Sequence, residues 1–172
     1  MGKRPTRIFA CDFETTVYDN QDRTDVWSSC LCELGDGHTP IIHGCISDTY
    51  NYFESLNCDI EAYYHNLKFD GRFWLYYLLH DLQYKQAYTG ELPHNVEWLD
   101  TKDMPRKSFK YLISRMGQWY TLTIRLNNGC YLTLKDSAKL FPFKLEEVAK
   151  GFKTAHTKLS MEYKGFRYPN CP

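Results

Sequence analysis

The chain has 172 residues, of which 43% are hydrophobic and 24% are charged, and its 21 basic residues balance 21 acidic ones. These values predict one folded globular domain with a sizeable core and exclude an intrinsically disordered chain. No apolar run approaches the roughly 20 residues of a transmembrane helix, and residues 1–7 are too polar to begin a secretory signal. We therefore expect a cytoplasmic protein with no membrane partner.

Charge is unevenly distributed along the chain. Residues 1–100 carry 7 basic and 16 acidic side chains, a net charge of −9, whereas residues 101–172 carry 14 basic and 5 acidic ones, a net charge of +9. Such asymmetry points to a polyanion-binding surface beside an acidic region. If both parts fold together, the charges instead intermix on the surface, and the sequence leaves both readings open.

The first third of the chain predicts three strands and a helix. Apolar or alternating runs over residues 8–13, 26–34 and 40–45 are typical of strands, and the polar segment 19–25 predicts a turn between the first two. Ser47 and Asp48 then offer an N-cap for a helix.

The remainder alternates strands with helices. A strand is predicted over residues 60–64, a buried helix over 72–82, a long irregular loop over 85–110, strands over 111–114, 118–126 and 130–136, and a short amphipathic helix over 144–152. Asn127-Asn128-Gly129 is a strong turn signal between the last two strands. This order predicts an α/β fold around a mixed sheet.

Cysteine usage favours free thiols. The seven cysteines are an odd number and include no Cys-x2-Cys pair. A zinc knuckle and a thioredoxin-type redox motif are therefore excluded, and free thiols fit a reducing compartment.

Two acidic side chains stand two positions apart at the end of the first strand. Because alternate residues of a strand share a face, the carboxylates of Asp12 and Glu14 are expected to project to one side. Carboxylates held close together repel one another, and a divalent cation with oxygen ligands relieves that repulsion.

Asp70 is a third candidate ligand, at the point where a predicted strand gives way to a helix. Strand ends are where open α/β sheets bind ligands. Three such carboxylates suit a pair of Mg²⁺ or Mn²⁺ ions about 3.5–4 Å apart, which would clamp a phosphodiester and activate water. The alternative is that Asp12 and Glu14 are solvated residues at a strand terminus.

Three blocks of sequence strengthen the metal-site interpretation. They are Cys-Asp-Phe-Glu-Thr-Thr at 11–16, His-Asn-Leu-Lys-Phe-Asp-Gly at 65–71 and Ile-Ser-Arg-Met-Gly-Gln-Trp-Tyr at 113–120, followed by Asp136-Ser137 with Leu140, Pro142 and Phe143. In this order they resemble the 3′–5′ exonuclease domain of protein-primed family B DNA polymerases, as found in small tailed phages with terminal proteins. The resemblance extends from about residue 8 to residue 163.

The resemblance implies a ribonuclease H-like (DnaQ-like exonuclease) fold, with a mixed β-sheet flanked by helices and an extra β-hairpin. It also implies a metal-dependent 3′–5′ DNA exonuclease that acts on the 3′ end of single-stranded DNA in the host cytoplasm. Its implied partners are a polymerase domain, a terminal protein or a host protein, and its implied cofactors are two Mg²⁺ or Mn²⁺ ions.

The resemblance also assigns roles to particular residues. Asp12, Glu14 and Asp70 match metal-binding carboxylates, and Lys158 matches a catalytic lysine that stabilises charge on the phosphate. The residues matched to those that line the single-stranded 3′ end are Thr15, Tyr63, His65, Asn66, Phe69, Phe73 and Ser137.

Some of these assignments have plain structural alternatives. Phe69 and Phe73 suit base stacking, but they also suit ordinary core packing. Lys158 also reads as one member of a basic tail. Ala138 stands where the family usually has a leucine that contacts the DNA end.

One element of the family pattern is missing. The third exonuclease motif, Tyr-x3-Asp on a C-terminal helix, has no counterpart at the expected place. We therefore expect residues 1–172 to form a single exonuclease-like domain without the third-motif helix and without the polymerase domain. Because that motif completes the metal site, cleavage is expected to be impaired.

Three hypotheses follow from the sequence. The chain is an exonuclease domain whose third motif comes from elsewhere, a stand-alone phage protein that binds nucleic-acid ends with impaired catalysis, or an inhibitor of a host defence protein built on this scaffold. The intact first two motifs favour metal or nucleic-acid binding. The basic residues proposed to steer a phosphate backbone toward the metals are Arg106, Lys107, Lys110, Arg115, Lys139, Lys153 and Lys158.

Overall fold

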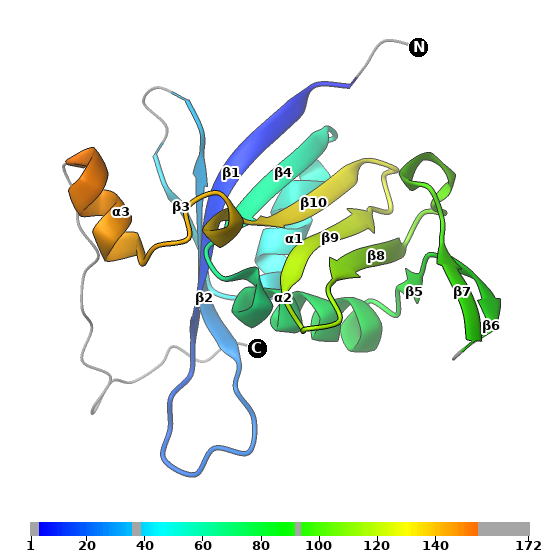
Figure 1. Cartoon of the computed structure of the whole chain (residues 1–172), viewed down its shortest axis with the longest axis horizontal. Helices are drawn as coiled ribbons and strands as arrows, with labels where there is room; N and C mark the ends of the chain where they lie inside the picture. The colour runs from blue at the N-terminus through cyan, green and yellow to red at the C-terminus, as the bar shows by residue number, and fades with distance from the viewer. Residues whose placement is uncertain (1–3, 36–38, 92–93, 155–172) are drawn as a thin grey trace.

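An eight-stranded mixed sheet forms the centre of the computed structural model, which describes residues 4–35, 39–91 and 94–154 (Figure 1). The strand order is β3-β2-β1-β4-β10-β9-β8-β5. The strands are β1 (Thr6–Thr15), β2 (Val26–Glu33), β3 (Ile41–His43), β4 (Asp59–Tyr64), β5 (Lys85–Gln86), β8 (Ser108–Ile113), β9 (Trp119–Arg125) and β10 (Tyr131–Asp136). The three central strands β1, β4 and β10 run parallel to one another, and β2, β3, β8 and β9 join them in antiparallel pairs.

The two faces of this sheet differ sharply in burial. Strands β4 and β10 alternate strictly between half-buried and buried residues, as period-2 side chains require. Helices α1 (Ile46–Ser55) and α2 (Leu67–Tyr76) cover the buried face, and α1 lies behind the sheet in Figure 1. Phe53 and Trp74 of these helices pack against each other and against aromatic residues of β1, which places the core on this side.

Helix α2 begins earlier than the sequence predicted. It starts at Leu67 rather than at residue 72, and a π-helical turn over Tyr77–Asp81 continues it. Its N-cap residue Asn66 adopts a left-handed conformation with φ of 69°, which lets the chain turn directly from β4 into the helix. As a result Asp70 lies in the first turn of α2 and not in a loop before it.

Helix α1 also starts earlier than expected. The N-cap is Cys45 and not Ser47, and its side chain makes no capping hydrogen bond. Instead the Cys45 Sγ and Ser47 Oγ atoms lie 2.9 Å apart. The helix was therefore predicted correctly, but its first residue does not follow the capping preference of Ser47 or Asp48.

The prediction of an irregular loop over residues 85–110 was wrong. The segment contains β5, a separate hairpin of β6 (Tyr88–Glu91) and β7 (His94–Trp98), the 3₁₀ turn η2 (Thr101–Asp103) and the first residues of β8. The Trp98 ring lies 4.8 Å from that of Tyr111 and fastens the hairpin to β8. Glycine and proline suggested a loop, but this long-range contact overrides the local signal. The family's expected extra hairpin is thus present.

The turn between β9 and β10 was predicted correctly. Gly129 adopts φ of 88°, and its N–H donates to the Leu126 carbonyl over 3.0 Å. The last described element is α3 (Leu145–Phe152), which lies to the left of the sheet in Figure 1 and buries none of its residues. The described cysteines are free thiols, as expected.

None of the helices in the described segments is both long and apolar enough to cross a membrane.

Candidate functional site

The candidate site lies where the three parallel strands end. β1, β4 and β10 run in the same direction, so their carboxyl ends meet at one edge of the sheet. β4 leads there into α2, and β10 leads into the 3₁₀ turn η3 (Ser137–Lys139). This edge is the usual ligand-binding edge of an α/β sheet.

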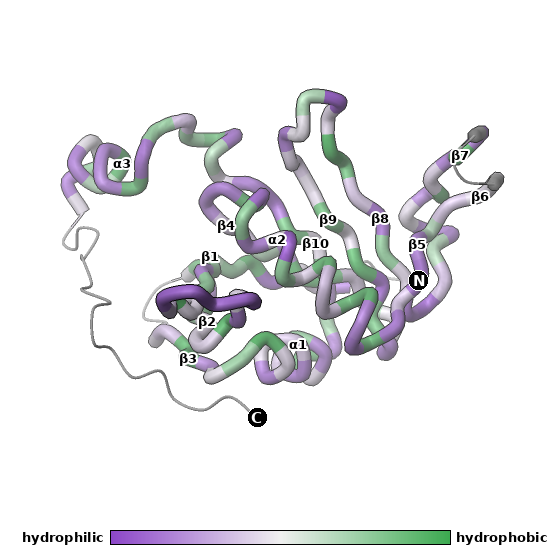
Figure 2. Tube along the Cα trace, turned by 90° about the horizontal axis from the view of Figure 1, so that it is seen from below, coloured by the Kyte–Doolittle hydropathy of each residue, from purple (hydrophilic) through white to green (hydrophobic). Residues whose placement is uncertain are grey.

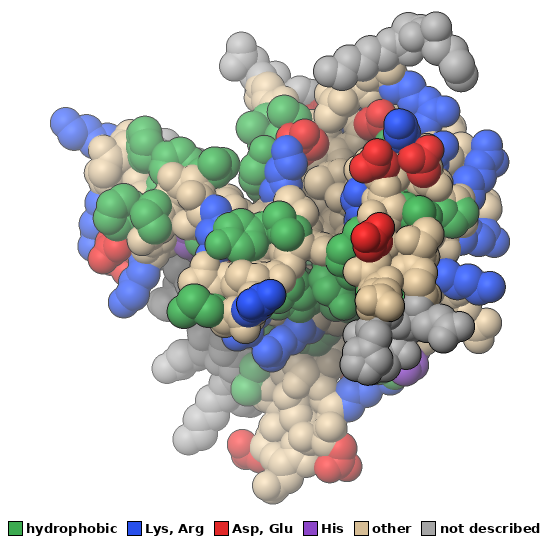
Figure 3. All heavy atoms as spheres, turned by 45° about the vertical axis from the view of Figure 1, so that its right-hand side comes forward, with side chains coloured by type: hydrophobic (Ala, Val, Ile, Leu, Met, Phe, Trp, Pro, Cys, Tyr) green, Lys and Arg blue, Asp and Glu red, His purple; other side chains and the backbone are tan. Residues whose placement is uncertain are grey.

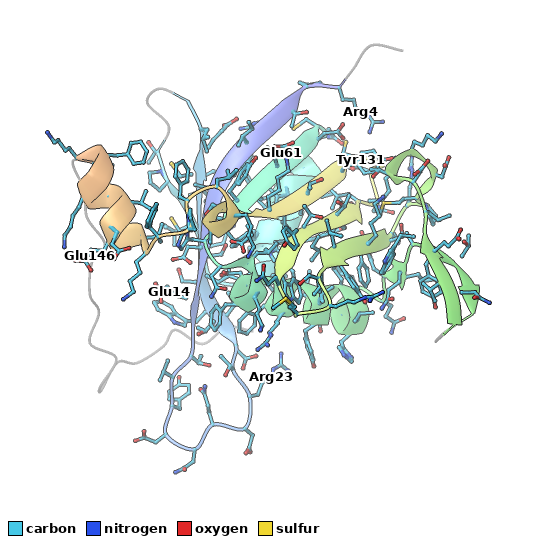
Figure 4. The ribbon with its side chains drawn as sticks, in the orientation of Figure 1. Arg4, Glu14, Arg23, Glu61, Tyr131 and Glu146 are labelled. Carbon is cyan, nitrogen blue, oxygen red and sulfur yellow. The ribbon has the colours of Figure 1, made fainter. Side chains whose placement is uncertain are left out.

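Asp12 and Glu14 lie on the face of β1 opposite the helices. Cys11 before them and Phe13 between them are buried, whereas Asp12 is exposed and Glu14 is half-buried. Figure 4 shows Glu14 on β1 at the side of the sheet that is nearer α3. The two carboxylates therefore project to one side, as the spacing predicted.

Asp70 reaches this edge from α2 and is only 2% exposed. Its Oδ1 atom accepts a hydrogen bond from the Phe13 N–H over 3.2 Å, so the carboxyl is fixed to the strand between Asp12 and Glu14. Burial, together with the charge of Asp12 nearby, raises the pKa of Asp70 to about 7 from its ordinary 3.8. A buried carboxyl beside another carboxylate is costly to ionise without a cation.

A further aspartate, Asp136, completes the acidic edge. It is 7% exposed, and its Oδ1 atom accepts the backbone N–H groups of Asn66 and Ala138, each over 3.0 Å. It also contributes to the raised pKa of Asp70. Asp136 stands in one of the motifs noted in the sequence but was assigned no role there, although its position at the end of a predicted strand was a usable signal. The Asp136 carboxylate therefore links the turn between β4 and α2 to the end of β10.

Several residues matched to the DNA-lining positions come together around this turn. His65 Nδ1 lies 3.2 Å from Ser137 Oγ, and the Ser137 hydroxyl donates to the Tyr64 carbonyl over 3.3 Å. Asn66 is exposed beside them, and Thr15 is half-buried at the end of β1. The polar groups that the sequence grouped by motif therefore share one edge.

Tyr63 occupies the open face of β4, one strand away from Asp12. Its hydroxyl donates to Glu61 Oε2 over 3.2 Å, and Lys135 Nζ lies 5.6 Å from its ring centroid. Lys135 also pairs with Glu61, with 2.8 Å between Nζ and Oε1. The carboxylate and the ammonium therefore fix the orientation of the Tyr63 ring on a polar sheet face, where Figure 4 shows Glu61.

Phe69 and Phe73 differ in burial, which bears on whether each ring stacks on a base or packs in the core. Phe69 is 45% exposed, whereas Phe73 is partly buried against the core. Their ring centroids are 5.4 Å apart in an edge-to-face contact. The Phe73 side chain therefore packs largely against the core, while Phe69 presents an exposed ring next to Asp70.

The basic residues do not all gather at this edge. Lys139 does, since its Nζ lies 4.0 Å from Asp136 Oδ2. Arg106 and Lys107 lie at the opposite end of the sheet. There the Arg106 guanidinium donates to the Asn127 carbonyl, and the Lys107 backbone N–H donates to the Arg125 carbonyl. Lys158, the matched catalytic lysine, falls outside the described residues.

The donor set suits a hard divalent cation. Asp12, Glu14 and Asp70 offer carboxylate oxygens, which Mg²⁺ and Mn²⁺ prefer over sulfur or imidazole ligands. Burial and the charge of Asp12 raise the pKa of Asp70, so a cation bound beside it would favour the ionised carboxylate. Within residues 4–35, 39–91 and 94–154, no group of three or more His, Cys, Asp or Glu side chains is already arranged to hold a metal. The metal site therefore stays a prediction.

Comparisons with known proteins agree with the motifs. No protein-family model matches the sequence. The chain is 29% identical to the DNA polymerase of Bacillus phage B103 over 163 residues, which cover 92% of this chain and 25% of that protein. It is 29% identical to the DNA polymerase of Bacillus phage phi29 over 167 residues, 95% of this chain and 26% of that protein. The chain thus spans about a quarter of the length of the curated relatives it matches.

Solved structures give the same answer. Phi29 DNA polymerase complexed with single-stranded DNA superposes with a TM-score of 0.74 at 26% identity, over 98% of this chain and 28% of that one. Its ternary complex with primer-template DNA and nucleotide gives a TM-score of 0.73 at 26% identity, over 98% and 27%. The predicted resemblance is confirmed: the chain is homologous to phi29-like protein-primed DNA polymerases, and its fold is ribonuclease H-like.

Proposed function

We propose that this chain is a single-stranded-DNA-binding 3′–5′ exonuclease-type domain of a protein-primed DNA polymerase, which hydrolyses the terminal phosphodiester with two Mg²⁺ or Mn²⁺ ions. The observation that carries the proposal is the position of Asp70, buried and bonded to Phe13 N–H between Asp12 and Glu14. The similarity to the DNA polymerases of Bacillus phages B103 and phi29, over about a quarter of their length, supports the proposal.

The metal ligands in this proposal are Asp12, Glu14 and Asp70. Bound ions would supply electrostatic stabilisation of the phosphate and a hydroxide nucleophile at neutral pH. The protein contributes the rigid placement of the carboxylates, because β1 and the first turn of α2 are both anchored in the core. Lys158 is proposed to stabilise charge that builds on the phosphate.

The remaining site residues would hold the single strand. The exposed ring of Phe69 offers a flat face for one base, and such stacking is sequence-tolerant. His65, Asn66 and Ser137 place polar groups beside Asp136, and neutral hydrogen bonds of this kind position sugar and phosphate without reading the base. The proposed setting is the host cytoplasm, with a polymerase domain and a terminal protein as partners.

A degradation assay tests the proposal. A 3′-labelled single-stranded DNA is expected to be shortened in the presence of Mn²⁺, and Asp12→Ala is expected to lower the rate by orders of magnitude. Asp19→Ala, which removes an exposed carboxylate from the segment between β1 and β2, is the matched control and should leave the rate unchanged. Cleavage that persists in Asp12→Ala would overturn the assignment.

Binding measured in parallel separates the alternatives. A protein that binds single-stranded DNA without cleaving it fits a catalytically impaired relative, and its log–log salt slope should be about −0.7 per phosphate neutralised. A protein that neither binds nor cleaves DNA contradicts both of these readings and leaves the host-protein inhibitor.

A further inference from the structure

The outward side of α2 has an unusual composition for a surface helix. Its exposed large side chains are Lys68, Phe69, Arg72 and Tyr76, and the π-helical turn that follows adds the exposed Leu79 and His80. Within α2 itself the sole carboxylate is Asp70, which is buried on the inward side, and the exposed Asp81 ends the turn that follows. Apolar and basic side chains without acidic ones therefore occupy a face that usually carries mixed charges.

These residues form two adjacent stripes. Side chains three and four apart share a helix face, so Lys68 and Arg72 form a basic stripe, and the residues from Phe69 to Tyr76 form an aromatic stripe beside it. Ring contacts trace the second stripe: Phe69 lies 5.4 Å from Phe73, and the Tyr76 ring stacks on that of His80 at 4.4 Å. Phe69 and Tyr76 stand about 10 Å apart along the helix axis.

The segment between β1 and β2 borders the far end of this surface. The Arg23 guanidinium lies over the Tyr76 ring, 5.1 Å from its centroid, and pairs with Asp25 over 2.7 Å. Figure 4 shows Arg23 at the base of this projecting segment, and Figure 3 shows green and blue side chains side by side on the face above it. Arg23 is charge-neutralised by its partner, so Lys68 and Arg72 supply the net positive charge.

We propose that the outward side of α2 continues the single-strand binding path, with bases against the aromatic stripe and phosphates on Lys68 and Arg72. The inference rests on the proposed function, because Phe69 at the head of the stripe is next to Asp70 and is shared with the candidate site. It extends that site by Arg72, Tyr76 and His80. A basic stripe on α2 beside flat rings complements a single-stranded nucleic acid.

Oligo(dT) probes of two lengths, about 4 and about 15 nucleotides, test the path, since modules of this kind contact roughly 4–16 nucleotides. Fluorescence anisotropy without divalent cations measures binding and avoids cleavage. Tyr76→Ala is expected to weaken binding of the long probe about tenfold, the loss of one stacked base, and to leave the short probe unchanged. Arg72→Ala is expected to reduce the salt slope for the long probe by about 0.7.

The control variant Lys150→Ala/Phe152→Ala removes an exposed lysine and an exposed phenylalanine from α3 and should bind both probes normally. All substituted residues are exposed, so unchanged thermal melting confirms folding. If the short probe binds but neither α2 variant weakens the long one, the path is wrong while the proposed function stands. If neither probe binds the unsubstituted chain, the proposed function itself fails.

Discussion

The two faces of the sheet come from alternate residues of the same strands, yet they have separate tasks. On β1, Phe9 and Phe13 point under the helices and are almost fully buried, whereas Asp12 and Glu14 between and beyond them point outward. The apolar face holds the strand in place, and the outward face is left free to carry carboxylates. Because alternate residues of a strand point to opposite faces, β1 is anchored in the core on one side and carries the candidate carboxylates on the other.

Removal of a large side chain under the helices should have the largest effect. Trp74 is fully buried, its Nε1–H donates to the Tyr64 hydroxyl over 3.0 Å, and its ring packs on Phe13 and Phe53. Trp74→Ala is expected to lower the free energy of unfolding by about 3–5 kcal/mol, measured by urea denaturation. Leu112→Ala on β8, where the side chain is 58% exposed, should cost less than about 1 kcal/mol. Equal losses would contradict the difference between the faces.

Asp70 lies where α2 meets β1, and its ionisation should make the free energy of unfolding depend on pH. Its pKa in the folded chain is about 7, above the ordinary 3.8. The unfolded chain therefore releases this proton first as pH rises, so the carboxyl's contribution to stability is present below pH 4 and is lost toward pH 7. Without divalent cations, the loss across that window is expected to be about 2–4 kcal/mol.

Asp70→Asn is the matched variant, because an amide oxygen still accepts the Phe13 N–H. Its unfolding free energy, measured by urea titration at several pH values, should be flatter from pH 4 to pH 7 than that of the unsubstituted chain. A variant that keeps the full slope would show that another group titrates in this window.

The sequence predicted individual strands better than the contacts between segments that are distant in the chain. The existence of β1, the limits of β4 to within one residue and the turn at Gly129 followed from local patterns, and the shared face of Asp12 and Glu14 followed from spacing. The hairpin after β5 did not follow from local patterns, because its Trp98 packs against Tyr111 on β8, a later segment of the chain.

The sequence identified candidate site residues but did not show how the fold brings them together. Asp70 was expected before a helix, and its position within the first turn depends on the left-handed Asn66, which helix periodicity does not reveal. Asp136 was noted in a motif but assigned no role, because its partners are backbone N–H groups brought in by the pairing of β10 with β4. Local patterns identify such a side chain as acidic, but only topology reveals what it bonds.

Helix α2 lies against the buried face so closely that one position tolerates no side chain. A Cβ atom added at Gly71 would lie 2.7 and 2.9 Å from two ring carbons of Trp119. Gly71→Ala is therefore expected to cost about 1–3 kcal/mol in the free energy of unfolding, despite the better helix propensity of alanine.

Gly151→Ala provides the contrast on α3. Nothing lies within 4 Å of a Cβ at Gly151, so the substitution should stabilise α3 by about 0.5–1 kcal/mol. Amide hydrogen exchange of α3 measures that local gain, and urea denaturation measures the cost at Gly71. A stabilising Gly71→Ala would show that α2 is not packed tightly against β9.

The smallest effect is expected on the open face, at the ion pair between Lys135 and Glu61. The pair is close, with 2.8 Å between Nζ and Oε1, but both side chains retain about a third of their exposure, 31% and 32%. Water therefore screens the attraction, and a double-mutant cycle with Lys135→Met and Glu61→Gln should give a coupling of no more than about 1 kcal/mol that shrinks as salt is added. A coupling of several kcal/mol, insensitive to salt, would mean that this face is shielded from water like the other, and the contrast between the two faces would fail.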